Sequence, residues 1–120
     1  NKLVKNKDIK SVENKLREHY SKFPENYYLP SFLDNHDMDR FLFKCGNDKD
    51  ILKQALKIQF STKQPKIIYY GTETGLTQEK SVFSVPQYGD LQARQTMKWK
   101  NQDEELKKYI KKLIKNYSHS

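Results

Sequence analysis

The stretch KIIYYGTETG, residues 66–75, joins the most strand-like run of the chain to a polar exit that contains two glycines. Two isoleucines and two tyrosines follow one another in it, without any alternation of apolar and polar residues. Such a run is typical of a strand that is buried on both faces, as in a parallel sheet. We therefore expect a strand near 66–70 in an α/β fold.

A second, shorter apolar run precedes it and ends in the sequence Asn35-His36-Asp37. We expect a strand near 29–34, in which Pro30 suits a strand start or an edge better than a strand centre. In α/β folds the reactive groups gather at the carboxyl ends of the strands. The two polar exits are therefore expected to form one shared site.

Two helices are predicted, one before each of these strands, because apolar residues recur there at three-four spacing. One covers about 8–20 with Ser11 as its cap, and the other lies near 47–60 with Asn47 or Asp48 as its cap.

A third helix is predicted near 102–117, with Asn101 as its cap and acidic residues in its first turn. The segment 71–100 before it has little periodicity, so we expect a long loop there. Loops of this length in small domains are usually functional or disordered.

The predicted order is helix, strand, helix, strand, helix. Phe32 and Ile67, within the two strands, are 35 positions apart, and one βαβ unit needs about 30 residues or more. A ribbon of two parallel strands would leave both edges open. We therefore expect the chain to be part of something larger, or to pair with another copy of itself.

Composition limits the classes of partner. The 120 residues suffice for one small domain, and the net charge of +8 comes almost entirely from lysine. Arginine, which supplies forked contacts to phosphates and bases, occurs only three times. We therefore expect a solvated lysine surface and no nucleic-acid partner.

Other features exclude further classes. No apolar run approaches the roughly 18 residues of a membrane span, so no membrane partner is expected. Cys45 is the only cysteine, which rules out an internal disulfide and a zinc motif. The chain begins with Asn, so we expect it to come from a longer parent. The sequence leaves the cellular location open and favours the cytoplasm.

Three stretches, in the right order, resemble the α-amylase family of glycoside hydrolases. Residues 32–37 (FLDNHD) are similar to the signature at the family's seventh barrel strand, and Arg40 falls where many members carry an arginine. Residues 67–75 are similar to the eighth strand. Residues 94–99 resemble an Arg-x-x-Met-x-Trp pattern before the final helix, with Thr96 where many members have proline.

The resemblance implies that 1–120 is a C-terminal fragment, about the last two βα units, of a TIM (β/α)₈ barrel. It implies a retaining glycoside hydrolase or transglycosylase that acts on α-linked glucans such as maltooligosaccharides. Such an enzyme needs a carboxylate nucleophile and a carboxylic acid, which the family carries on its fourth and fifth strands. Neither has a match here, so the chain alone is predicted to be inactive and to need the rest of the barrel or another copy.

The resemblance also implies roles for single residues. Asp37 matches the carboxylate that stabilises the transition state, and His36 matches the imidazole that contacts the same sugar ring. Asn35 and Arg40 are further candidates for substrate binding, although Asn35 equally suits a turn former and Arg40 a local ion-pair partner. Arg94 is read as a packing or ion-pair residue. No cofactor or metal site is predicted: family members often bind calcium, but no ligands for it are visible in this sequence.

Two other interpretations remain open at this point. Asn-His-Asp also follows a strand in dimetal phosphoesterases, which need more histidine ligands than this chain offers near the cluster. A non-enzymatic basic binding module would instead be expected to carry Arg-rich helices or stacked aromatics on a sheet.

Overall fold

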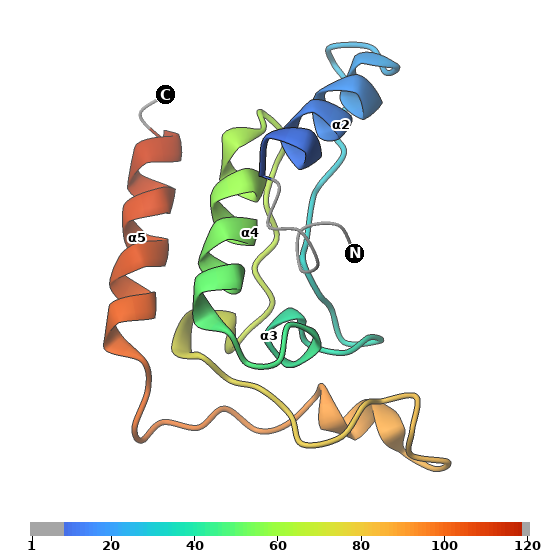
Figure 1. Cartoon of the computed structure of the whole chain (residues 1–120), viewed down its shortest axis with the longest axis vertical. Helices are drawn as coiled ribbons and strands as arrows, with labels where there is room; N and C mark the ends of the chain where they lie inside the picture. The colour runs from blue at the N-terminus through green and yellow to red at the C-terminus, as the bar shows by residue number, and fades with distance from the viewer. Residues whose placement is uncertain (1–8, 119–120) are drawn as a thin grey trace.

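The computed structural model describes residues 9–118, which form helices joined by long irregular segments (Figure 1). The elements are α2 (Ile9–Ser21), α3 (Phe41–Lys44), α4 (Lys49–Ser61), the 3-10 turns η1 (Thr72–Thr74) and η2 (Gly89–Gln92), and α5 (Glu104–Ser118). Helix α4 lies in the middle, with α5 along one side and α2 against its other side (Figure 1). None of these helices combines the length and the hydropathy that a membrane span requires.

Helix α4 corresponds to the helix expected near 47–60, and its start is set by a side-chain cap. The Asp48 carboxylate accepts hydrogen bonds from the backbone N–H groups of Asp50 and Ile51, at 3.0 and 3.3 Å. This satisfies two of the donors that a helix start leaves without a partner. Of the two predicted caps, Asp48 is therefore the correct one.

The core lies where α4 faces α5, α3 and α2. Leu52 and Leu56 of α4 and Leu106 of α5 are almost completely buried. The other buried apolar members of this cluster are Phe41, Leu42, Cys45, Ile51, Ala55, Ile58 and Ile110. Helices α2 and α5 thus both pack against α4. The three-four spacing predicted the apolar face of α4 but not which helices cover it.

The predicted caps of the other two helices are wrong. The described part of α2 already includes Ile9 and Lys10, so Ser11 lies within the helix and does not precede it. Helix α5 begins at Glu104, and the Asp103 carboxylate accepts the hydrogen bond of the Leu106 N–H at 3.0 Å. Asp103 also pairs with Lys49 Nζ at 2.6 Å, so one side chain starts α5 and ties it to the first turn of α4.

The strands expected near 29–34 and 66–70 are not formed within residues 9–118. The two segments are extended and meet at a single parallel bridge between Ser31 and Lys66. The Gln59 amide of α4 donates to the carbonyls of Ser31 and Ile67, at 3.0 and 3.5 Å, and so holds both segments. Their parallel direction agrees with the prediction, but the ladder does not extend further.

The expectation of burial on both faces is also wrong for this chain. Ile67 is 52% exposed, and none of residues 66–70 is buried. A buried strand needs a hydrogen-bonded neighbour on each side and a layer on each face. Within residues 9–118 each segment bridges only to the other, and Leu33 and Ile68 pack against the helical core.

Candidate active site

The turn of residues 34–40, which follows the first extended segment, is fixed at its start by a buried carboxylate. Asp34 Oδ2 accepts the hydrogen bond of the Phe41 N–H at 2.9 Å, at the start of α3. Burial raises the pKa of Asp34, although this hydrogen bond and the positive charges of Arg40 and Lys44 oppose the rise. Asp34 therefore anchors the turn and is not available to a ligand.

The other end of the turn is fixed by Asp39, which is also buried. Its carboxylate accepts hydrogen bonds from Gln78 Nε2, Ser81 Oγ and the Val82 N–H, at 2.9, 2.7 and 2.7 Å. A carboxylate with three donors can tie a remote loop to the turn, because charge-assisted hydrogen bonds are the strong ones. Asp39 thus anchors the loop 77–94 beside the turn.

Asn35 shapes the backbone between these two anchors. Its side-chain oxygen accepts the hydrogen bond of the Asp37 N–H at 2.9 Å, which closes an Asx turn. This contact occupies the amide oxygen and fixes where the next two side chains project. Of the two roles considered for Asn35, the structure thus shows that of a turn former.

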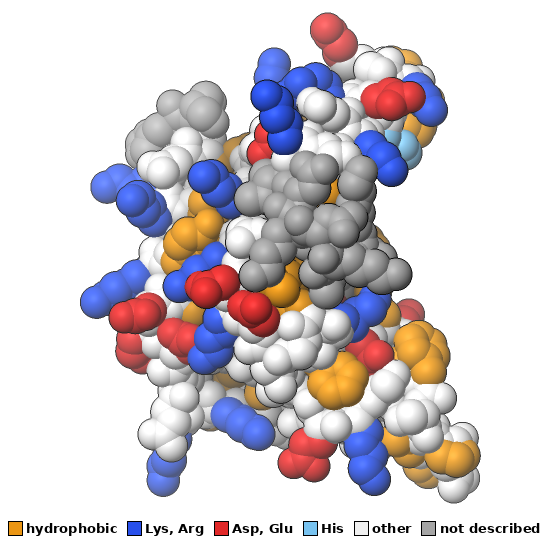
Figure 2. Space-filling model, viewed as in Figure 1, with side chains coloured by type: hydrophobic (Ala, Val, Ile, Leu, Met, Phe, Trp, Pro, Cys, Tyr) orange, Lys and Arg blue, Asp and Glu red, His pale blue; other side chains and the backbone are white. Residues whose placement is uncertain are grey.

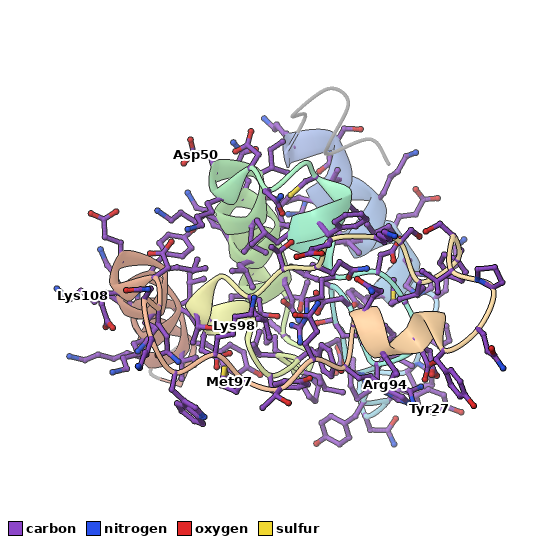
Figure 3. The ribbon with its side chains drawn as sticks, turned by 90° about the horizontal axis from the view of Figure 1, so that it is seen from below. Tyr27, Asp50, Arg94, Met97, Lys98 and Lys108 are labelled. Carbon is purple, nitrogen blue, oxygen red and sulfur yellow. The ribbon has the colours of Figure 1, made fainter. Side chains whose placement is uncertain are left out.

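His36 and Asp37 are the exposed part of the turn. Their side chains are 62% and 69% exposed, and His36 Nε2 lies 3.4 Å from Asp37 Oδ2. Arg94, which lies directly beyond η2 (Figure 3), pairs with Asp37 Oδ1 through Nη2 at 2.9 Å and donates from Nε to the His36 carbonyl at 2.9 Å. Its Nη1 pairs with Asp90 at 2.8 Å. One guanidinium thus holds Asp37 from a segment 57 residues away.

Arg40 lies beneath the turn and is only 1% exposed. Its Nη1 donates to the Tyr70 carbonyl at 2.8 Å, and its guanidinium carbon lies 4.6 and 4.9 Å from the ring centres of Tyr69 and Tyr70. A more distant contact, at 3.4 Å, joins Nη2 to the Ala93 carbonyl. The structure therefore places this candidate for substrate binding in the interior, away from the exposed pair.

Two tyrosines at the end of the second extended segment support the site from the other side. Tyr69 donates its hydroxyl hydrogen to the Ala93 carbonyl at 2.9 Å, and Tyr70 donates to the Gln95 carbonyl. Burial, followed by the neighbouring Tyr70, raises the pKa of Tyr69, so it stays a donor. These two contacts hold the segment on either side of Arg94.

The exit of residues 71–75 itself lies against the start of α5, where the Thr74 carbonyl accepts the hydrogen bond of the Asp103 N–H at 3.1 Å. The expectation that the two polar exits form one shared site therefore stays a prediction.

Sequence reasoning missed how Arg94 and Asp39 act. The Arg-x-x-Met-x-Trp resemblance singled out Arg94, and an ion pair was expected of it, but nothing in the sequence named Asp37 as its partner. Nothing in the sequence distinguished Asp39, which is buried, from the other acidic residues of the cluster. No group of three or more possible metal ligands occurs among the described residues.

Comparisons with known proteins agree on one family. The family model "Alpha amylase, catalytic domain" matches residues 1–118. Alpha-amylase 2 of Dictyoglomus thermophilum is 37% identical over 87 residues, and the intracellular maltogenic amylase of Bacillus subtilis is 32% identical over 91 residues. These alignments cover 71% and 74% of this chain but only 15% and 14% of those relatives.

A solved structure gives the same result for the fold. The α-amylase from Geobacillus thermoleovorans, complexed with acarbose, superposes with a TM-score of 0.71 at 27% identity. The superposition covers 89% of this chain and 23% of that one. The chain therefore belongs to the α-amylase family of glycoside hydrolases.

Proposed function

We propose that this chain provides about the last two βα units of a (β/α)₈ barrel that cleaves or transfers α-linked glucans by a retaining mechanism. Relatives that match the chain bear the names maltogenic amylase and cyclomaltodextrin glucanotransferase, and the solved neighbour holds acarbose. The 89% coverage by that neighbour supports placing the chain within such a barrel. Family membership leaves no support for a dimetal phosphoesterase or a basic binding module.

Asp37 is proposed to stabilise the transition state, and its exposed, oriented carboxylate is the observation that carries the proposal. An ionised carboxylate has about four lone-pair positions. Arg94 occupies one of those on Oδ1, at 2.9 Å, and the side chain remains 69% exposed. The remaining positions can accept hydrogen bonds from two hydroxyls of one sugar ring, and such charge-assisted bonds strengthen as the ring gains positive charge.

His36 is proposed to contact the same ring. Its Nε2 lies 3.4 Å from Asp37 Oδ2, and a neutral imidazole can donate from one nitrogen while the other accepts. Asn35 supports both residues by closing the turn. Arg40 acts as a positioning residue, because its buried guanidinium fixes the carbonyls of Tyr70 and Ala93 beneath the site.

The nucleophile and the acid are proposed to lie outside this chain, on other strands of the barrel. The chain alone would then lack the two groups that break the glycosidic bond. It would need the rest of the barrel, or another copy of itself, to complete the site. Calcium, if the whole enzyme binds it, would be held by other residues.

The proposal is tested by combining an activity assay with a binding assay. We expect the 120-residue chain to release no sugar from maltoheptaose, measured by chromatography of the products. We also expect acarbose, followed by ¹H–¹⁵N NMR, to perturb the amides of residues 34–41 and 94. The Asp37→Asn variant should lose these perturbations, whereas Asp50→Asn, an exposed change at the start of α4, should keep them. Release of sugar from maltoheptaose by the chain alone would overturn the proposal. Amide perturbations by acarbose that are the same in the parent chain and in Asp37→Asn would also overturn it.

A further inference from the structure

Gln78 is a buried polar side chain to which the proposed function assigns no role. It is 4% exposed in this chain alone, and any further chain that packs on the molecule can only bury it more. It lies beside Asp39 and Arg40, which are also buried, whereas Figure 2 shows other charged side chains spread over the surface of the molecule. We call these three residues the buried cluster. Because burying polar and charged groups is costly unless they are hydrogen-bonded, the contacts within this cluster are important for the fold around it.

The amide of Gln78 uses its oxygen and both of its hydrogens. Oε1 accepts the hydrogen bond of the Arg40 N–H at 2.7 Å, and Nε2 donates to Asp39 Oδ1 at 2.9 Å and to the Lys80 carbonyl at 2.8 Å. Rotating the amide by half a turn would place its oxygen against the Asp39 carboxylate and its hydrogens against the Arg40 N–H. Only one orientation of the amide therefore fits. Gln78 thus joins the turn of residues 34–40 to the loop of residues 77–94 in a fixed geometry.

The first part of this loop is in direct contact with the part that carries Arg94. Gln92 Oε1 accepts the hydrogen bond of the Lys80 N–H at 3.2 Å. Gly89 lies so close to the Val82 carbonyl that a Cβ would not fit between them. Lys80 and Val82 are held by the buried cluster, while Gly89 and Gln92 are the ends of η2, which leads to Arg94. The position of Arg94 therefore depends on the buried cluster.

Arg94 connects the loop back to the turn from which the buried cluster starts. Its Nη2 pairs with Asp37 Oδ1 at 2.9 Å, and its Nε donates to the His36 carbonyl at 2.9 Å. Both contacts are exposed, and an exposed ion pair contributes little to stability by itself. The buried contacts must therefore hold the loop in place so that Arg94 meets Asp37.

We propose that Gln78 is a positioning residue for the Asp37 carboxylate, because its amide holds the loop in the one arrangement that brings Arg94 onto Asp37. This inference rests on the proposed function and adds to it a buried residue that acts through Arg94. Without the amide, Arg94 is released and Asp37 is oriented by the Asn35 turn alone. A binding group that loses its supporting contacts binds its ligand more weakly.

The test uses Gln78→Met, which keeps the length of the side chain but removes its hydrogen bonds. Gln87→Met makes the same chemical change at an exposed position of the same loop and is the matched control. Hydrogen exchange of the Arg94 Nε–H, followed by ¹⁵N NMR, reports on the contact of Arg94 with the His36 carbonyl and needs no ligand. The affinity of the 120-residue chain for acarbose is measured by NMR titration.

We expect Gln78→Met to speed exchange of the Arg94 Nε–H about tenfold while exchange in α4 stays within about twofold of the parent chain. Acarbose should bind about fivefold more weakly to this variant, and Gln87→Met should change neither quantity. In a chain that already carries Arg94→Ala, Gln78→Met should weaken acarbose binding no further, because both changes break the same series of contacts.

Three results would overturn the inference. One is unchanged exchange of the Arg94 Nε–H in Gln78→Met, and another is an equal loss of acarbose affinity with and without Arg94. The third is faster exchange in α4 as well, which would assign Gln78 to the stability of the whole chain. If acarbose binding is the same in the parent chain and in Asp37→Asn while Gln78→Met still releases Arg94, the proposed function fails and the positioning of Arg94 by Gln78 stands.

Discussion

The α4–α5 helix pair and the face that carries His36 and Asp37 are stabilised in different ways. The helix pair buries Leu52, Leu56 and Leu106 almost completely. The site face is held by polar side chains instead, above all Asp39 and Arg94, which reach across 39 to 58 positions of sequence. Apolar packing thus gives this chain its stability, while a few long-range hydrogen bonds give the site its geometry. Substitutions in each region can separate the two contributions.

The largest effect is expected in the helix pair. Leu106→Ala removes a fully buried side chain between α4 and α5, and such a cavity costs about 2–5 kcal/mol of unfolding free energy. Urea unfolding followed by circular dichroism measures it. Ile114→Ala on the same helix, at a position that is 48% exposed, should cost much less. Similar losses at both positions would mean that the helix pair is not the main source of stability.

A smaller and local effect is expected from Asp39→Ala. The change leaves the donors of Gln78, Ser81 and Val82 without their acceptor, which costs about 1–3 kcal/mol for a buried donor. Hydrogen exchange should become faster across residues 77–94 and stay slow in α4. Glu79→Ala, an exposed acid in the same loop, is the control. Faster exchange throughout the chain would show that the site face and the helix pair are not separable.

Acid should change the stability contributions of one carboxylate in each region in opposite directions. In the helix pair this carboxylate is Asp103. The hydrogen bond from Lys49, followed by that of the Leu106 N–H, lowers the pKa of Asp103 below its usual 3.8. Its stabilising contribution is therefore complete above about 3.8 and is lost as the pH falls through the lower value of the folded state. Asp103→Asn should lower the unfolding free energy near neutral pH and should reduce the fall of that free energy as the pH decreases. Parallel curves of unfolding free energy against pH for the two proteins would contradict the assignment.

Asp34 reports on the site face, with the opposite sign. Burial raises the pKa of Asp34 above 3.8, so as the pH falls the folded state binds a proton at a higher pH than the unfolded state does. The unfolding free energy therefore falls as the pH rises from 3.8 through the raised value. Asp34→Asn removes this penalty, and its amide oxygen can still accept from the Phe41 N–H. Urea unfolding between pH 3 and 7 should show that the unfolding free energy of the variant increases relative to that of the parent chain as the pH rises. A constant difference would contradict the burial argument.

The smallest effect on stability is expected from Arg94→Ala. Its pair with Asp37 is exposed, with side chains 40% and 69% accessible, and exposed pairs contribute about 1 kcal/mol or less. Acarbose binding should nevertheless weaken, because Asp37 loses the group that orients it. Arg17→Ala, which removes an arginine of α2, should change neither quantity. Unaltered binding by Arg94→Ala would show that the orientation of Asp37 does not depend on Arg94.

The sequence predicted the features that depend on local periodicity. The buried face of α4, the cap at Asp48 and the helix that becomes α5 follow from residues close together in the chain. The turn at 34–40 was also found, because a polar cluster after an apolar run is a local signal. The pattern of neighbouring residues could not show which acidic residues of that turn are buried. Asp34 and Asp39 are anchors while Asp37 is exposed, and only the contacts with Phe41 and Gln78 decide this.

The strands were the main error, and the reason is physical. An apolar run such as 66–70 specifies burial only when neighbours exist to bury it. Within residues 9–118 that run pairs with the 29–34 segment alone, at one bridge. The pairing of Arg94 with Asp37 was equally out of reach, because opposite charges far apart in sequence carry no information on which of them meet. Short α3 was missed because its four residues are too few to show a period.

A crystal structure of the chain soaked with acarbose tests the central claim most directly. The account predicts a sugar ring at the turn 34–40, with hydroxyls within hydrogen-bond distance of Asp37 Oδ2 and Arg94 still on Oδ1. Acarbose ordered elsewhere on the chain, with no hydroxyl near the Asp37 carboxylate, would contradict it.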